Sequence, residues 1–230
     1  MEEVVARMRN LVDVEQDQVI VAKAKVRNSE ATKQRIVQAA REEFARFGYS
    51  GARIERIAKS AKANTQLLYR YFGKKDDLYV AALEATYSSI RNRESLLDLT
   101  HLSPLEGIQQ FVGFTFDYLS TDPFFVRLMM NENLMEGEYV KRSKNIPSTS
   151  RPLLLTLSDL LKKGQKKGMF IKIDPAELYI TILSLGFVHV SNKHTLRIMF
   201  GKEIADQKSL QNRRKIAIRT ITLLLTCKDG

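Results

Sequence analysis

Apolar residues along the chain recur mostly three and four positions apart, a period typical of helices that bury one face. Ile36, Ala40 and Phe44 form one such stripe, and Gly48 follows it as a residue suited to end the helix. No stretch alternates convincingly between apolar and polar positions, as a half-buried strand would. The pattern therefore predicts an all-α fold.

Several helix starts are marked by a capping residue followed by proline. Ser103 and Asp174 each begin a capping box with proline at the first helical position, and a proline also follows Asp122. Pro147 is expected in the loop before the seventh helix, and Pro152 just inside that helix. We predict about nine helices, over residues 30–47, 54–60, 64–72, 75–97, 104–120, 123–135, 150–167, 175–199 and 207–226.

The stretch 61-AKANTQLLYRYFGKKDDLY-79 differs from an ordinary surface helix, because apolar and aromatic residues cover most of its circumference. Asn64 is a good N-cap for a short helix that ends near Phe72, and another short helix precedes it. Two short helices joined by a three-residue turn, after a longer helix, predict a helix-turn-helix. Such a unit places its second helix in the major groove of DNA.

The roles within this unit follow from the spacing. Leu68 and Phe72, four positions apart, are expected to face the core, which leaves Thr65, Gln66 and Leu67 free to meet base edges. Tyrosine hydroxyls and the ammonium group of Lys75 are expected to contact phosphates. The predicted DNA-contacting residues are Arg53, Asn64, Thr65, Gln66, Leu67, Tyr69, Arg70, Tyr71 and Lys75.

The charge distribution supports a polyanionic partner. The chain of 230 residues has a formal net charge of +11, and residues 21–75 alone account for +10. A solubilising surface would be mixed in sign and spread out. A basic block within a folded segment instead favours nucleic acid.

Composition excludes several classes of protein. The single Cys227 excludes an internal disulfide framework and fits a reducing compartment. No run approaches the ~18 uncharged apolar residues of a membrane span, and the acidic start, Met1-Glu2-Glu3, does not suit a signal peptide. We therefore expect a cytoplasmic protein with no membrane partner.

The segment 47-FGYSGARIERIAKSAKANTQLLYRYFGKKDDLY-79 resembles the signature of the TetR family of bacterial transcriptional regulators. Two positions depart from the family pattern: Ala52 replaces the usual threonine, and Lys62 replaces the usual turn glycine. The run 169–201 is similar, more distantly, to the penultimate helix of the RutR-like subgroup. The matching residues are Phe47, Gly48, Gly51, Ile57, Ala58, Ala61 to Asn64, Leu68 to Phe72, Lys75 and Leu78.

The resemblance implies a helix-turn-helix DNA-binding domain over 29–74 and an effector-binding and dimerisation domain over 75–230. Residues 1–28 form an N-terminal extension, either frayed or weakly helical. This extension contains Lys23, Lys25 and Arg27. Two interpretations are open: it is an arm that reaches a neighbouring groove of the DNA, or it is a disordered, solvated tail. The implied function is that of a homodimeric repressor, which binds a pseudo-palindromic operator and is released by a small-molecule effector.

Members of the family dimerise by pairing their last two helices into a four-helix bundle. Both helices of this chain are apolar enough to form such an interface. A purely internal role for the penultimate helix is the alternative. The predicted dimer residues are Leu178, Ile182, Leu185, His189, Ile216, Thr220 and Leu223.

The resemblance also places an effector pocket among the central helices, where aromatic and Met residues are dense. For any single aromatic residue, core packing is an alternative. The predicted pocket residues are Phe111, Phe114, Tyr118, Phe125, Met129 and Asn133.

No catalytic or metal constellation emerges from the sequence. His189 and His194 are five positions apart, so they point about 140° away from each other around a helix, and His101 stands alone. We expect His189 to hydrogen-bond to the backbone, and we expect no cofactor, no metal and no enzymatic activity. The main alternative function is a ligand-insensitive, dimeric DNA-architectural protein.

Overall fold

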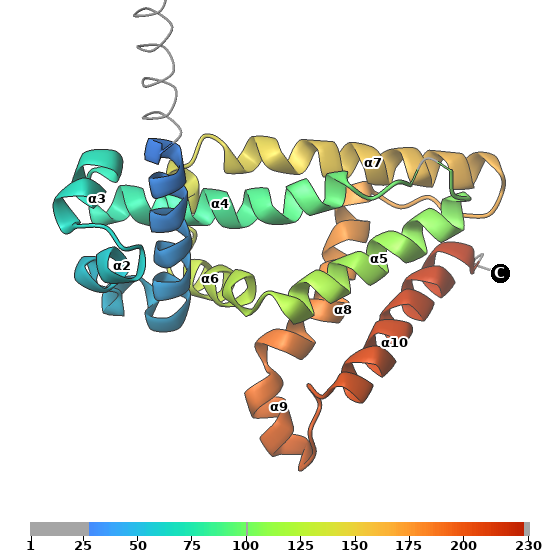
Figure 1. Cartoon of the computed structure of the whole chain (residues 1–230). Coiled ribbons are helices and arrows are strands. Elements are labelled where there is room, and N and C mark those ends of the chain that lie inside the picture. Colours follow the sequence, from blue (N-terminus) through green and yellow to red (C-terminus); the bar gives the residue numbers. More distant parts are fainter. Residues whose placement is uncertain (1–27, 100, 228–230) are drawn as a thin grey trace, which may run out of the picture.

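The computed structural model describes residues 28–99 and 101–227, and all regular secondary structure in this part of the chain is helical (Figure 1). This confirms the predicted all-α fold. A first helix occupies residues 28–51. It is followed by α2 (Ile54–Ser60), α3 (Thr65–Phe72), α4 (Lys75–Ser95), α5 (Pro104–Thr121), α6 (Pro123–Leu134), a 3-10 turn η1 (Val140–Arg142), α7 (Ile146–Lys166), α8 (Pro175–Ser191), α9 (Lys193–Phe200) and α10 (Gln207–Thr226).

The first helix, α2 and α3 form a compact unit at one end of the molecule (Figure 1). Ile36, Phe44, Ile57 and Leu68 are buried together, and Phe72 packs against them, as the spacing predicted. The same core continues into α4, so no gap in packing separates the helix-turn-helix from the rest of the chain.

The body of the molecule is built around α4 and α5. Figure 1 shows α4 running from beside α3 along α7, while α5 crosses toward α8 and α10. A second core joins these helices through Ile108, Leu157, Leu178 and Ile221. Within the described residues, no helix is both long enough and apolar enough to cross a membrane.

Three helices differ from the sequence prediction by more than two residues at a boundary. The first helix continues to residue 51, although Gly48 has the left-handed φ of 68° expected of a capping glycine. The expected single helix over 175–199 was wrong, because the backbone breaks at Asn192 and separates α8 from α9. The Thr195 hydroxyl donates to the carbonyl oxygen of Asn192 at this break, and such local side-chain-to-backbone bonds compete with helical hydrogen bonds.

The start of α7 was also placed wrongly. The helix begins at Ile146, so Pro147 lies in its first turn and Pro152 lies inside it. At this earlier start, the Oγ of Ser143 accepts hydrogen bonds from the N–H groups of Asn145, the N-cap residue, and Ile146, the first residue of the helix.

Candidate functional sites

Helix α3 presents a polar and aromatic face to solvent. Gln66, Tyr69 and Arg70 are exposed, whereas Leu68 is buried beneath them. Thr65, Leu67 and Tyr71 are half-buried. The exposed face of α3 therefore contains side chains that can reach a groove, held in place by one apolar anchor.

The N-terminus of α3 is capped as expected. The Oδ1 atom of Asn64 accepts a hydrogen bond of 2.7 Å from the N–H of Leu67. Asn64 is exposed, and its side-chain NH₂ group remains available as a donor.

Tyr71 ties α3 to the first helix. Its hydroxyl accepts a hydrogen bond of 3.1 Å from Ser29 Oγ, and Lys33 Nζ lies 5.6 Å from its ring centroid. The hydrogen bond from Ser29 and the neighbouring Arg70 lower the pKa of the hydroxyl. The hydroxyl proton itself is still free to be donated to another acceptor.

The basic side chains of this unit differ in how far they are neutralised. Arg56 is paired with Glu43 at 2.5 Å and lies over the ring of Phe47. Arg53, by contrast, is exposed and makes no ion pair among the described residues, while its backbone N–H donates to Glu43. Lys62, which the sequence analysis did not select, is likewise exposed in the turn before α3.

The start of α4 is fixed by contacts that the sequence did not reveal. Lys75 Nζ lies 4.8 Å from the ring centroid of Tyr49, and the Tyr49 hydroxyl donates to Asp76. Asp76 also accepts a hydrogen bond of 2.8 Å from Arg142 of η1. These two donors hold the pKa of Asp76 below its ordinary value. Residues 49, 76 and 142 are too far apart in sequence for spacing to have linked them.

A second connection joins the first helix to the body. Arg41 pairs with Asp122 at the junction of α5 and α6, and its Nε donates to Thr86 of α4 over 3.1 Å. Both charged side chains are nearly buried. The amide of Asn131 on α6 donates to the carbonyl of Phe44.

The six predicted effector residues do not line one cavity, and this corrects the sequence prediction. Phe111 faces a cavity of about 420 Å³ between α4, α5 and α7, whereas Phe114 and Tyr118 face a separate hollow. Phe125 is buried in an internal cluster against which Met129 packs. Asn133 is exposed and donates back to its own helix at Met129. Aromatic density therefore marked core packing more than a binding site.

The 420 Å³ cavity contains a buried ion pair that the sequence analysis missed. Arg91 pairs with Glu94, three residues further along α4, and donates to the Tyr179 hydroxyl over 2.8 Å. The two side chains are only 12% and 7% exposed. Because burial outweighs the attraction of Arg91, the pKa of Glu94 is raised above its ordinary value. Arg91 Nε and Glu94 Oε1 have no hydrogen-bond partner among the described residues.

The outer faces of α8 and α10 form an exposed apolar stripe, made of Ile180, Val188, Ile216, Leu223 and Leu224. Two predicted dimer residues do not belong to it: Leu178 and Ile182 are buried in the second core. The helix is apolar on both sides, and the prediction chose the inner one. Thr220 is exposed between the α10 members, and Leu185 and His189 are half-buried.

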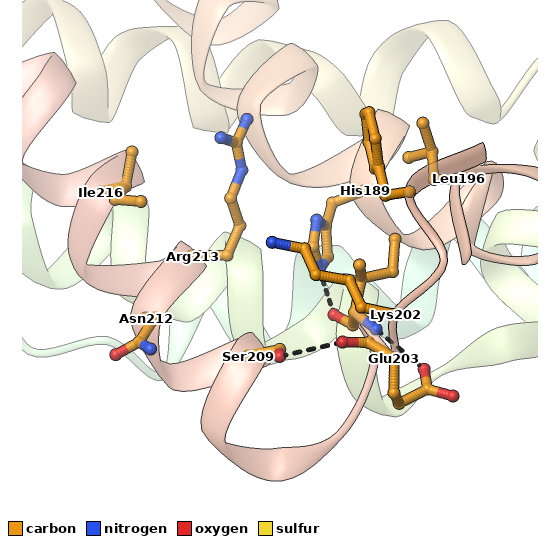
Figure 2. A pocket seen from close by; sticks show the side chains of 10 residues that line it. His189, Leu196, Lys202, Glu203, Ser209, Asn212, Arg213 and Ile216 are labelled. Atoms are coloured by element: carbon orange, nitrogen blue, oxygen red, sulfur yellow. Dashed lines mark hydrogen bonds between the residues drawn. The ribbon is translucent and has the colours of Figure 1, made fainter. Parts of the chain in front are cut away.

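His189 bonds to the backbone, as expected. Its Nε2 lies 2.7 Å from the carbonyl oxygen of Ile204. Figure 2 shows His189 and Lys202 facing Arg213 and Ile216 across a hollow of about 570 Å³ beside the start of α10. Among residues 28–99 and 101–227, no group of three or more His, Cys, Asp or Glu side chains is arranged to hold a metal ion.

Comparison with known proteins identifies the family. Residues 36–82 match the family of bacterial regulatory proteins named tetR, and residues 104–221 match the tetracyclin repressor-like C-terminal domain. The HTH-type transcriptional repressor NicS of Pseudomonas putida is 32% identical over 186 residues, which cover 80% of this chain and 88% of NicS.

Two further comparisons agree. The HTH-type transcriptional regulator RutR of Escherichia coli (strain K12) is 25% identical over 205 residues, covering 83% of this chain and 91% of RutR. The crystal structure of a TetR transcriptional regulator from Chloroflexus aurantiacus has the same fold, with a TM-score of 0.66 at 19% identity over 88% of this chain and all of that one. The helix-turn-helix, the two family matches and the likeness to NicS together show that the chain belongs to the TetR family of transcriptional regulators.

Proposed function

We propose that this regulator is a homodimeric repressor, which binds a pseudo-palindromic DNA operator and leaves it when a small molecule binds the body. In this proposal residues 29–74 contact DNA, and residues 75–230 bind the effector and the second subunit. The predicted arm of Lys23, Lys25 and Arg27 lies outside the described residues. The observation that carries the proposal is the exposed face of α3 within a basic helix-turn-helix.

DNA recognition follows from that face. Gln66 can make paired hydrogen bonds to adenine, and Leu67 can contact a thymine methyl group. Arg53, Tyr69 and Lys75 flank them with groups suited to phosphates. Two copies related by a two-fold axis would place their α3 helices in successive major grooves, about 34–36 Å apart.

The apolar stripe on α8 and α10 supports the dimerisation that the proposal requires. Ile216 and Leu223 are 51% and 47% exposed, although both are large and apolar. An exposed apolar patch on a soluble protein commonly marks an interface. Packing α8 and α10 against the same helices of a second copy would cover the stripe and form a four-helix bundle.

Release by a ligand requires the cavity to communicate with α3, and α4 joins the two. Lys75 begins this helix beside α3, and Arg91 faces the cavity about 24 Å further along it. Asp76 holds the start of α4 to Tyr49 of the first helix, so a displacement of α4 would move the DNA-binding unit. A coupling of only about 1.4 kcal/mol would weaken DNA binding tenfold.

The test is a binding measurement on a duplex selected from a random-sequence library by the full-length protein. Gln66→Ala should lower affinity for the selected duplex by about 1–3 kcal/mol and reduce discrimination against single-base changes. Gln211→Ala, at an exposed position on α10, is the matched control and should bind as the wild type does. Failure of the wild-type protein to enrich any duplex would refute the proposal.

A further inference from the structure

Folding alone does not explain the lysine at position 62. Lys62 lies in the turn between α2 and α3 with a left-handed φ of 52°, where a residue with a Cβ atom is crowded. Its side chain is exposed, so it contributes little packing that would offset this conformation. Backbone strain of this kind clusters at functional sites, which directs attention to what the side chain contacts.

The ammonium group of Lys62 has a charge that the protein does not neutralise. It makes no ion pair and no side-chain hydrogen bond with residues 28–99 or 101–227. Ion pairs with acidic side chains do neutralise four other basic residues of the same unit: Lys33, Arg41, Arg46 and Arg56. An exposed, unpaired cation keeps its full attraction for a polyanion.

The first helix places a second cation beside Lys62. The Nε of Arg35 donates to the carbonyl oxygen of Ala61 over 3.4 Å, and its Nη2 donates to Thr32 over 3.1 Å. These bonds hold the guanidinium against the turn. An arginine has five N–H donors, so three remain for another acceptor. Arg35 and Lys62 both line a groove of about 660 Å³ between the first helix, α2 and the turn.

The lining of this groove favours an anion. Its carboxylate, Glu42, accepts a hydrogen bond of 3.0 Å from Gln38 and lies 3.8 Å from Arg46. The charge of Glu42 is therefore already countered, whereas Arg35 and Lys62 have no acidic partner among the described residues. A phosphate group in the groove would accept charge-assisted hydrogen bonds from both cations.

The groove lies on the flank of the DNA-binding face away from Tyr71. On the first helix, Lys33 lies over the Tyr71 ring and Arg35 bonds to the turn, and residues two apart on a helix point about 160° away from each other. Lys62 is two residues before Asn64, the N-cap of α3, so their Cα atoms are at most about 7 Å apart. Because the major groove is about 12 Å wide, a lysine so close to the N-terminus of α3 can reach a phosphate at its edge.

We propose that Lys62 and Arg35 together bind a phosphate of the operator backbone, on the flank opposite Tyr71. Lys62 supplies an ammonium group on a long side chain, and Arg35 supplies a guanidinium held against the turn. This contact adds to the α3 contacts of the proposed function and rests on that function. A glycine at position 62 would relieve the strain but could not make the contact.

The test measures duplex binding by the full-length protein with alanine, glycine or arginine at position 62. Fluorescence anisotropy with selected and scrambled duplexes covers about 50 to 200 mM salt. Lys62→Ala and Lys62→Gly each remove one cation per subunit, so the salt slope of a dimer should fall by about two units. Affinity for both duplexes should fall about tenfold at 50 mM salt and approach the wild-type value at 200 mM. Lys62→Arg should keep the wild-type slope.

The glycine variant separates binding from folding. Glycine relieves the strain at this position and alanine retains it. If Lys62 had only a structural role, affinity would follow stability, and Lys62→Gly would bind DNA at least as well as the wild type. A phosphate contact instead makes both variants lose affinity alike, while urea titration of the same preparations reports their stabilities.

Two further variants complete the test. Arg35→Gln removes the second charge and keeps an amide donor, so it should lower the affinity and the salt slope as Lys62→Ala does. Lys163→Ala removes the same charge as Lys62→Ala from an exposed site on α7, and it is the matched control that should change neither quantity.

Three results would overturn the inference: an unchanged salt slope in Lys62→Ala, wild-type affinity in Lys62→Gly, or unchanged binding by Arg35→Gln. Each of them would leave the proposed function intact, provided that the wild type binds its selected duplex in the same experiment. Failure of the wild type to enrich any duplex would instead refute the proposed function, and the phosphate contact with it.

Discussion

At the scale of single residues, Lys62 in the turn between α2 and α3 has a backbone conformation that is unfavourable for a residue with a Cβ atom. Lys62 has a φ of 52°, in the left-handed region where a Cβ crowds the carbonyl oxygen. Hydrogen bonds from Lys62 N–H to Lys59 and from Ala63 N–H to Ala58 hold the turn in this shape. The sequence marked this position only as a lysine where the family usually has glycine.

Replacing Lys62 with glycine should therefore stabilise the protein. We expect the free energy of unfolding of Lys62→Gly to exceed that of Lys62→Ala by about 0.5–1 kcal/mol, since glycine relieves the strain but gains entropy in the unfolded chain. Urea titration of both variants measures the difference. Lys62→Ala removes the same charge and keeps the Cβ, so equal stabilities would contradict the strain argument.

Local chemistry explains which residues the sequence could reveal. Asn64 and Ser103 were found as caps because a cap acts within three residues of itself. Arg142 and Asp76 were missed because their contact joins segments 66 residues apart, and nothing local marks either one. Arg91 and Glu94 had the spacing of an ordinary surface pair, and only the fold buries them.

At the scale of elements, α8 shows the limit of periodicity. Leu178 and Ile182 face the internal core, while Ile180 and Val188 face outward, and all four are apolar. A hydrophobic pattern identifies a buried helix face by contrast with a polar face, and α8 offers no such contrast. The existence of the helix was predictable from the sequence, but its orientation was not.

The outward stripe makes a specific prediction about assembly. Leu223→Glu should weaken self-association at least tenfold, or about 1.4 kcal/mol, because the two-fold symmetry of a dimer buries two added charges. Sedimentation equilibrium measures the dissociation constant. Leu155→Glu on α7, at a residue 58% exposed outside the stripe, is the control and should leave association unchanged. An unaltered dissociation constant in Leu223→Glu would place the interface elsewhere.

At the scale of the whole molecule, charge and packing are distributed differently along the chain. Residues 21–75 carry +10 of the net charge of +11, yet the core beneath the helix-turn-helix continues into α4 and reaches Leu128 of α6. The described part of this basic segment, residues 28–75, therefore shares its core with the body. The charge excess was visible in the sequence, whereas the continuity of the core required the fold.

This concentration of charge makes a prediction about salt. Lys75 and Tyr71 sit at the edge of the α3 face, and each is oriented by an aromatic or hydroxyl neighbour, Tyr49 and Ser29 respectively. The double variant Tyr71→Phe with Lys75→Ala should lose affinity for every duplex sequence alike, because phosphate contacts carry no sequence information. Removing one ammonium group from each subunit lowers the number of counterions released on binding by about one per subunit, so the salt slope of a dimer should fall by about two units.

Fluorescence anisotropy with selected and scrambled duplexes, between about 50 and 200 mM salt, measures both effects. Lys163→Ala on α7 removes the same charge from an exposed site on the body and should change neither slope nor affinity. The single variant Tyr71→Phe separates the hydroxyl from the ammonium, since it should lower affinity with the slope unchanged. If the double variant kept the wild-type slope, Lys75 would have no phosphate partner, and its contact with Tyr49 would serve only to position α4 beside α3.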